Sequence, residues 1–186
     1  PFDDVDVIEG QASVAVEIEA QLGFCPDHIV MPVGGGGLSA GVLNYFKNNA
    51  QYSLIEPLGG ASLWAALIAG RPVSLDKVDT FADGAAVGQI GNKPFETLKS
   101  IGLANVLRAP VDRVCITMLE MLNVEGIVLE PAGALSIDAL QDLGQAISGR
   151  TVVCITTGGN FDFERLPEVK ERSQRFKGCL LYTSPS

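Results

Sequence analysis

The stretch that decides the fold runs from residue 29 to residue 46 and reads IVMPVGGGGLSAGVLNYF. An apolar run ends at four consecutive glycines, and apolar residues then recur with helical spacing at Leu38, Val42 and Phe46. We therefore predict a buried strand, a glycine turn and the start of a helix. The first turn of a helix has unpaired N–H groups and a partial positive charge, and glycines let an anion approach them closely. The junction is typical of a phosphate-binding site.

A second junction between a strand and glycines lies near the other end of the chain. The β-branched run from Thr151 to Thr157 predicts a strand buried on both faces of a parallel sheet, and two glycines follow it. Between the two junctions, apolar runs near 52–56 and 105–107 alternate with helical patterns. This alternation predicts an α/β fold, with an open, mostly parallel sheet flanked by helices. Ligands of such sheets bind at the carboxyl ends of the strands, where both junctions lie.

Composition argues against several classes of protein. The 186 residues carry a formal net charge of −9, which disfavours nucleic acid and anionic membranes as main partners. No apolar stretch is long enough to span a bilayer. The four cysteines form no C-x-x-C pair and, with only one histidine, no zinc site. Cys115 and Cys154 lie in apolar runs as free thiols, which favours a cytoplasmic protein.

Three other segments lack a clear assignment to strand or buried helix. The acidic residues 1–9 predict a solvated loop before a helix at about 11–22, although the adjacent Asp3 and Asp4 also allow paired-carboxylate catalysis. Residues 71–91 show no periodicity, and a loop of this length within a domain usually has a functional role. The charged residues 166–177 predict a solvated helix.

Two kinds of phosphate ligand fit the first junction. Gly35, Gly37 and Ala40 satisfy the dinucleotide pattern G-x-G-x-x-[GA], and Glu56 ends the next predicted strand, where an acid binds ribose hydroxyls. The alternative is a compact phosphate ester that carries a ring. Four glycines offer more consecutive N–H donors than the dinucleotide turn uses. The Thr157 hydroxyl would then meet the far side of the ring.

Six short motifs occur in an order that resembles a known family. They are PFDD (1–4), IEGQ (8–11), PVGGGGL (32–38), FADG (81–84), EPAGA (130–134) and TGGN (157–160). Together they look like the C-terminal half of the catalytic region of a threonine ammonia-lyase (threonine dehydratase), and the resemblance covers about residues 1–178. These enzymes belong to the tryptophan-synthase-β-like, fold type II family of pyridoxal-phosphate (PLP) enzymes. The resemblance implies the large-domain part of that fold, PLP as cofactor, and deamination of L-threonine to 2-oxobutanoate, with L-serine a poorer substrate.

The resemblance also implies which residues contact the cofactor. Backbone N–H groups of the glycine run hold the PLP phosphate, and a hydroxyl bonds the pyridine nitrogen where the family usually has serine. These positions are Gly34, Gly35, Gly36, Gly37, Leu38 and Thr157. A hydroxyl does not favour a protonated pyridinium, which suits β-elimination. Glu56 matches a cation-binding acid of serine racemases, but the companion aspartate is Ser62 here. We therefore expect no metal site, and we expect Glu56 to lie on a polar rim.

The resemblance further implies that catalytic groups are missing. The family's Schiff-base lysine lies in an S-F-K-x-R-G stretch. No lysine of this chain has that context, whether Lys47, Lys77, Lys93, Lys99, Lys170 or Lys177. We therefore expect no catalytic residue within the chain, and we expect it to be inactive alone. The chain begins with Pro1 rather than methionine, which favours a start within a longer protein.

By the same resemblance the chain divides into three parts. Residues 1–165 correspond to the C-terminal part of the catalytic domain, and 166–178 to a linker helix toward an absent regulatory domain, as in isoleucine biosynthesis. Residues 179–186 resemble translated sequencing-adapter sequence and are predicted to be a non-native tail. A homotetramer is implied for the full-length protein. Two alternatives remain: another fold type II enzyme, such as a serine racemase or threonine synthase, or a non-catalytic Rossmann-like nucleotide-binding module.

Overall fold

The computed structural model describes residues 2–179, and its centre is a sheet of four parallel strands. The strands are β1 (His28–Pro32), β2 (Gln51–Pro57), β3 (Val106–Ala109) and β4 (Val152–Cys154). Their order in the sheet is β3-β2-β1-β4, and every pairing is parallel. The predicted α/β fold with a parallel sheet is therefore confirmed. Apart from Cys179, the predicted non-native tail lies outside the described residues.

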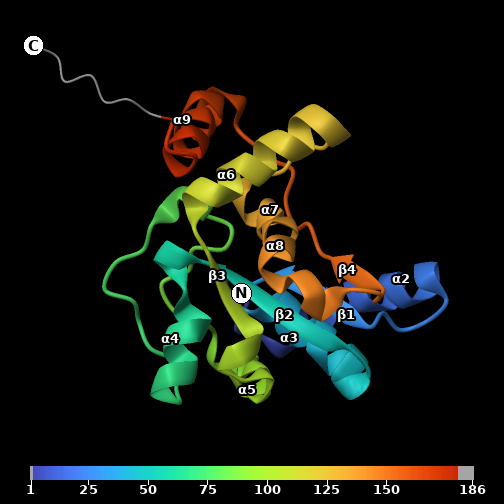
Figure 1. Cartoon of the computed structure of the whole chain (residues 1–186). Coiled ribbons are helices and arrows are strands. Elements are labelled where there is room, and N and C mark those ends of the chain that lie inside the picture. The colour runs from blue at the N-terminus through green and yellow to red at the C-terminus, as the bar shows by residue number, and fades with distance from the viewer. Residues whose placement is uncertain (1, 180–186) are drawn as a thin grey trace, which may run out of the picture.

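Helices connect the strands and cover both faces of the sheet. In chain order they are α1 (Val5–Gln11), α2 (Ser13–Leu22), α3 (Gly37–Phe46), α4 (Ser62–Ala69), α5 (Asn92–Leu98), α6 (Val111–Glu120), α7 (Pro131–Asp138), α8 (Leu140–Leu143) and α9 (Leu166–Phe176). Figure 1 shows α6, α7 and α9 on one side of the sheet and α3 and α5 on the other. No helix among the described residues is long and apolar enough to cross a membrane.

Successive residues of β1 contribute to two separate apolar cores. Ile29 and Met31 belong to the core that β1 forms with α3 and α5, whereas Val30 belongs to the core beneath α6 and α7. All three side chains are fully buried. Since side chains alternate between the faces of a strand, a strand covered on both faces must be apolar at every position. This explains the unbroken apolar run that precedes the glycines.

The strand order places the two glycine junctions beside each other. β1 lies between β2 and β4, and residues 28–30 pair with residues 152–154. The chain leaves β1 toward β2 on one side and returns as β4 on the other side. The loops that follow β1 and β4 therefore leave the carboxyl edge of the sheet as neighbours. Open α/β sheets bind their ligands at such a reversal of strand order.

Strand β4 is shorter and less buried than the sequence predicts. Only Val152–Cys154 form the strand, and all three residues are half-buried. The prediction of a long strand buried on both faces was therefore wrong. Among the described residues β4 pairs with β1 alone, so it is an edge strand and its apolar side chains are only partly covered.

The acidic N-terminal segment forms helix α1 rather than a loop. Asp4 Oδ1 accepts the N–H of Asp6 at 2.9 Å and caps the start of α1. Asp3 Oδ1 accepts the N–H of Lys93 at 2.7 Å, at the start of α5. This bond holds the pKa of Asp3 below its ordinary value. The two neighbouring carboxylates thus cap two different helices, and they form no catalytic pair.

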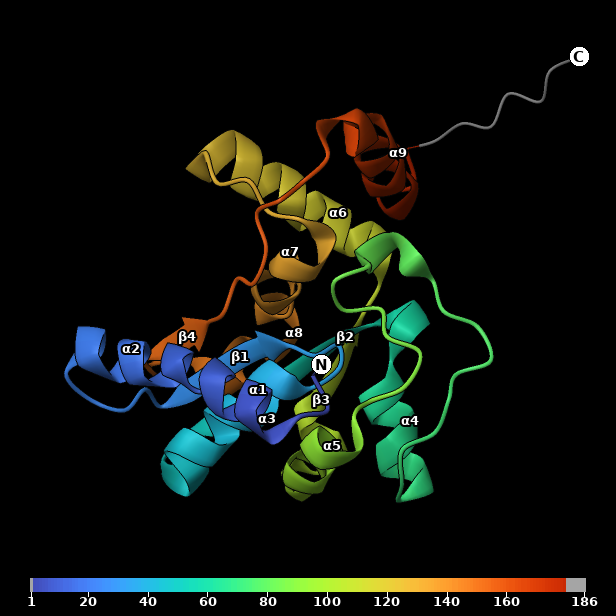
Figure 2. The same cartoon turned by 180° about the vertical axis from the view of Figure 1, so that it is seen from behind.

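The sequence predicts that the charged helix α9 is solvated. In the structure one side of the helix is buried. Val169 and Ser173 are buried, and α9 packs against α6. Figures 1 and 2 both place α9 beside the first part of α6. Arg172 Nη1 lies 3.2 Å from Asp112 Oδ1 in the first turn of α6. Charged side chains therefore attach this helix to the domain instead of only facing water.

Candidate functional site

A cavity of about 390 Å³ opens at the carboxyl edge of the sheet. All six predicted cofactor residues line it: Gly34, Gly35, Gly36, Gly37, Leu38 and Thr157. The long loop between α4 and α5 contributes Gly84, Ala85 and Val87 to the wall, and the N-terminal segment contributes Phe2. Sequence reasoning named Phe2 only as part of a motif and gave it no place in the site.

The glycine loop presents free N–H groups to this cavity. Gly36 caps α3 with a φ of 89°, in the left-handed region that favours glycine. Among the described residues, no carbonyl oxygen accepts a hydrogen bond from the backbone N–H groups of residues 34–39. These donors lie at the positive end of the α3 dipole. The arrangement fits a phosphate dianion, because it supplies several N–H donors without a side chain in the way.

Glycine is also required here because other segments approach the loop closely. A Cβ atom on Gly35 would overlap the ring of Phe2. A Cβ atom on Gly34 would lie 3.0 Å from the carbonyl oxygen of Gly84, and one on Gly36 would lie 2.7 Å from Ile90 Cδ1. The first two contacts close the cavity, whereas the third joins the loop to the core beneath α5.

The loop that carries Thr157 contacts the start of α7 at Glu130. The backbone N–H of Glu130 donates to the carbonyl of Gly158 at 3.0 Å, which ties the start of α7 to the loop after β4. The Glu130 carboxylate also lies against Gly158, since a Cβ there would overlap it. Burial, together with the negative charge of Asp83, raises the pKa of Glu130. The motif EPAGA contributed only to the family resemblance, and the sequence did not indicate this contact.

Glu56 is not available to a ligand. Its side chain is fully buried, and its two oxygens accept the N–H groups of Leu63 at 2.7 Å and Trp64 at 2.8 Å. Burial raises the pKa of Glu56 to about 7 in spite of these bonds. The expectation of an acid on a polar rim was wrong, because Glu56 caps α4 from inside the core. A dinucleotide would find no acid here for its ribose hydroxyls.

The chemistry of the cavity wall is that of a binding site for an anion with an attached ring. Within residues 2–179, no lysine lines the cavity, and no three His, Cys, Asp or Glu side chains gather at metal-binding distance. Besides backbone N–H groups and the Thr157 hydroxyl, the wall offers the Gln11 amide, the Ser39 hydroxyl and apolar side chains. Such a surface can hold and orient a ligand, and it supplies no amine nucleophile.

Comparison with known proteins agrees with this geometry. The profile of a family described as "pyridoxal-phosphate dependent enzyme" matches residues 1–158, a span that includes the glycine loop and Thr157. The chain belongs to this family. The free N–H groups at the start of α3 fit the phosphate that gives the cofactor its name.

Individual relatives resemble this chain in sequence or in fold. "L-threonine dehydratase biosynthetic IlvA" of Bacillus subtilis is 44% identical over 98% of this chain. The processed form of threonine deaminase isoform 2 from Solanum lycopersicum superposes with a TM-score of 0.84 and 35% identity, covering 93% of this chain and 51% of that one. A serine racemase from Dictyostelium discoideum gives a TM-score of 0.76 and 28% identity, covering 88% and 53%. This chain spans 44% of the length of the Bacillus relative.

Proposed function

We propose that this chain is the phosphate-binding part of a PLP-dependent threonine dehydratase. The intact enzyme would convert L-threonine into 2-oxobutanoate and ammonia, with L-serine as a secondary substrate. One observation carries the proposal: the free N–H groups at the start of α3 and the Thr157 hydroxyl line the same cavity. The name of the Bacillus relative, a biosynthetic threonine dehydratase, supports the choice of substrate.

The residues of the chain have separate tasks in this function. The N–H groups of residues 34–38 bind the phosphate, and Thr157 Oγ1 donates a hydrogen bond to the ring nitrogen without giving it a full positive charge. Bound PLP supplies a ring that withdraws electrons from the α-carbon of the amino acid. Phe2, Gly84, Ala85 and Val87 line the same cavity, where they would cover the bound ligand and exclude water. No described lysine lines the cavity, so we assign the family's lysine to the part of the enzyme outside this chain.

The proposal extends to organisation and biological role. We propose that residues 1–165 belong to the catalytic domain, that 166–178 link it to a regulatory domain, and that 179–186 are not native to the protein. The word "biosynthetic" in the name of the Bacillus relative supports a role in isoleucine biosynthesis. A homotetramer is the assembly proposed for the full-length enzyme. The free thiols of Cys25, Cys115 and Cys154 support a cytoplasmic location.

A chimera tests the proposed activity. Residues 1–178 replace the aligned part of the Bacillus subtilis relative, so that the rest of that enzyme supplies the groups outside this chain. We expect the chimera to bind PLP and to form 2-oxobutanoate from L-threonine, followed as its phenylhydrazone. The 186-residue chain alone should form none. A folded chimera that retains PLP and releases no 2-oxobutanoate would contradict the proposal.

Serine racemization is the second candidate function, because the Dictyostelium serine racemase has the same fold over most of this chain. The same chimera separates the two candidates. With L-serine, a racemase portion would give D-serine faster than pyruvate, and chiral chromatography measures both. We expect pyruvate to dominate, and D-serine as the main product would favour the racemase.

A further inference from the structure

Phe81 is a buried residue at the start of the segment that walls the cavity. Its side chain is 3% exposed, and Asp79 Oδ1 accepts its backbone N–H at 3.0 Å. Gly84, three positions later, brings its carbonyl oxygen against Gly34 of the glycine loop, and Ala85 follows it in the cavity wall. Only residues 82 and 83 therefore separate Phe81 from Gly84 in the cavity wall.

That stretch is a tight turn with little freedom of its own. The N–H groups of Ala85 and Ala86 both donate to the carbonyl of Ala82, at 2.9 and 2.7 Å. Ala82 and Ala85 are buried. Because the turn is closed by its own hydrogen bonds, a displacement of Phe81 moves the turn as a unit, and with it the wall at residues 82–87.

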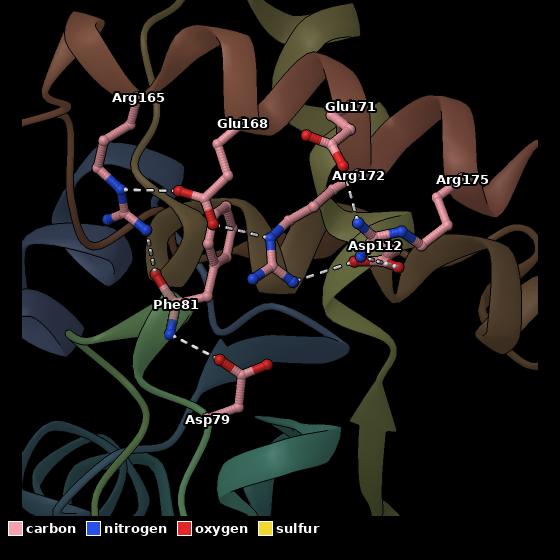
Figure 3. A network of polar contacts seen from close by, with 8 residues as sticks. All are labelled: Asp79, Phe81, Asp112, Arg165, Glu168, Glu171, Arg172 and Arg175. Carbon is pink, nitrogen blue, oxygen red and sulfur yellow. Dashed lines mark hydrogen bonds and ion pairs between the residues drawn. The ribbon is translucent and has the colours of Figure 1, made fainter. Parts of the chain in front are cut away.

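Two arginines hold the Phe81 ring. The guanidinium carbons of Arg165 and Arg172 lie 4.6 Å and 4.2 Å from the ring centroid. Figure 3 shows the ring between the two side chains. Both distances are within the range of cation–π attraction, which strengthens when the partners are shielded from water. Arg165 Nη2 also lies 3.4 Å from the Phe81 carbonyl oxygen, which accepts its hydrogen bond.

Acidic side chains keep the two cations in place. Glu168 accepts hydrogen bonds from Arg165 Nε at 3.4 Å and from Arg172 Nε at 3.0 Å, and Asp112 at the start of α6 accepts one from Arg172 Nη1 at 3.2 Å (Figure 3). Neither Arg165 nor any described residue of α9 lines the cavity. Phe81 is the residue that contacts both guanidinium groups and lies next to the cavity wall in the chain.

We propose that Phe81 is a positioning residue, through which Arg165 and Arg172 at α9 fix the cavity wall at residues 82–87. The inference rests on the proposed function, since PLP is the ligand whose binding the wall affects. Coupling between two sites is reciprocal. Detachment of α9 therefore weakens PLP binding, and bound PLP strengthens the attachment of α9 by the same factor.

The test compares three variants of the 186-residue chain. The double variant Arg165→Ala/Arg172→Ala removes both cations from the ring. Arg175→Ala is the matched control, because Arg175 contacts Asp112 and Glu171 but not Phe81. Arg172→Lys keeps one positive charge beside the ring. Each protein is measured by amide hydrogen exchange without ligand and by equilibrium dialysis with PLP.

We expect the double variant to exchange residues 82–87 faster and to bind PLP roughly tenfold more weakly, since it loses two cation–π contacts. Arg175→Ala should match the unmodified chain in both measurements, and Arg172→Lys should lie close to it. A general loss of stability would instead speed exchange in every segment. The inference is overturned if the double variant and Arg175→Ala behave alike at residues 82–87.

The two arms of the test separate this inference from the proposed function. If the unmodified chain bound no PLP, the cofactor site would be in doubt. Hydrogen exchange at residues 82–87 would still decide the positioning role of Phe81 by itself.

Discussion

Replacing Glu56 with glutamine should remove a large pH dependence from the stability of the fold. The carboxylate is buried, and its pKa is raised from 4.5 to about 7 by that burial. The folded state therefore binds this proton more tightly than the unfolded chain does. As the pH rises above 4.5, the unfolded chain loses the proton first, and the free energy of unfolding falls until the pH passes the folded pKa.

The size of the effect follows from the pKa difference. One pKa unit corresponds to about 1.4 kcal/mol. Complete ionisation of Glu56 therefore lowers the free energy of unfolding by about 3 kcal/mol. About 2.5 kcal/mol of that change falls between pH 5 and pH 8. In the Glu56→Gln variant this contribution is absent, and only the other titrating groups change the stability.

Urea unfolding at pH 5 and pH 8 measures the difference. For each protein we take the change in the free energy of unfolding between the two pH values. Subtracting the change in Glu56→Gln from the change in the unmodified chain removes the contributions of all titrating groups that the two proteins share. Glu125→Gln is the control, because Glu125 is exposed and its variant should follow the unmodified chain. The reasoning is refuted if the stabilities of Glu56→Gln and the unmodified chain change in parallel between the two pH values.

Five further variants test the packing and the site. Gly36→Val should lower the free energy of unfolding by about 3 kcal/mol in urea titration, because it places a branched side chain at a φ of 89° against the core beneath α5. Thr157→Val should weaken PLP binding about tenfold in equilibrium dialysis, whereas Thr157→Ser keeps the hydroxyl and should change it less than about twofold. Arg113→Met should destabilise the chain by about 3–5 kcal/mol in the same urea assay, because it leaves the buried Asp138 carboxylate without its 2.7 Å partner. Breaking the exposed pair Lys99–Glu96 with Lys99→Met should cost less than about 1 kcal/mol.

Strand β1 and the glycine loop were predictable because their residues allow few other conformations. A run such as residues 29–33, apolar at every position, suits a strand covered on both faces, and four glycines interrupt any regular element. Helix α4 ends at Ala69 because Gly70 takes the left-handed conformation after it, a stop that a glycine in the sequence indicates. The meeting of the two junctions could also be expected, since the carboxyl ends of parallel strands share an edge.

The features that were missed depend on tertiary contacts, some of them with partners far away in the sequence. Asp3 finds the N–H of Lys93 ninety positions later, and Glu56 is enclosed by the helix that it caps. Arg172 is charged, which suggests solvent, yet its guanidinium group packs on the Phe81 ring, where cation–π attraction holds it. No local sequence pattern indicates such contacts. The charge of a residue was therefore a poor predictor of its solvent exposure.

The pairing of β1 with β4 also sets the order in which the molecule can form. His28 and Val152, which are partners in the sheet, stand 124 positions apart in the chain (152 − 28). β1 meets β2 after a single intervening helix, whereas closing the loop to β4 costs more chain entropy and comes late in folding. Thr157 follows β4, so the cavity has only one of its two sides until that last strand docks. We therefore expect PLP present during refolding to stabilise the finished domain without changing the rate of the earlier steps.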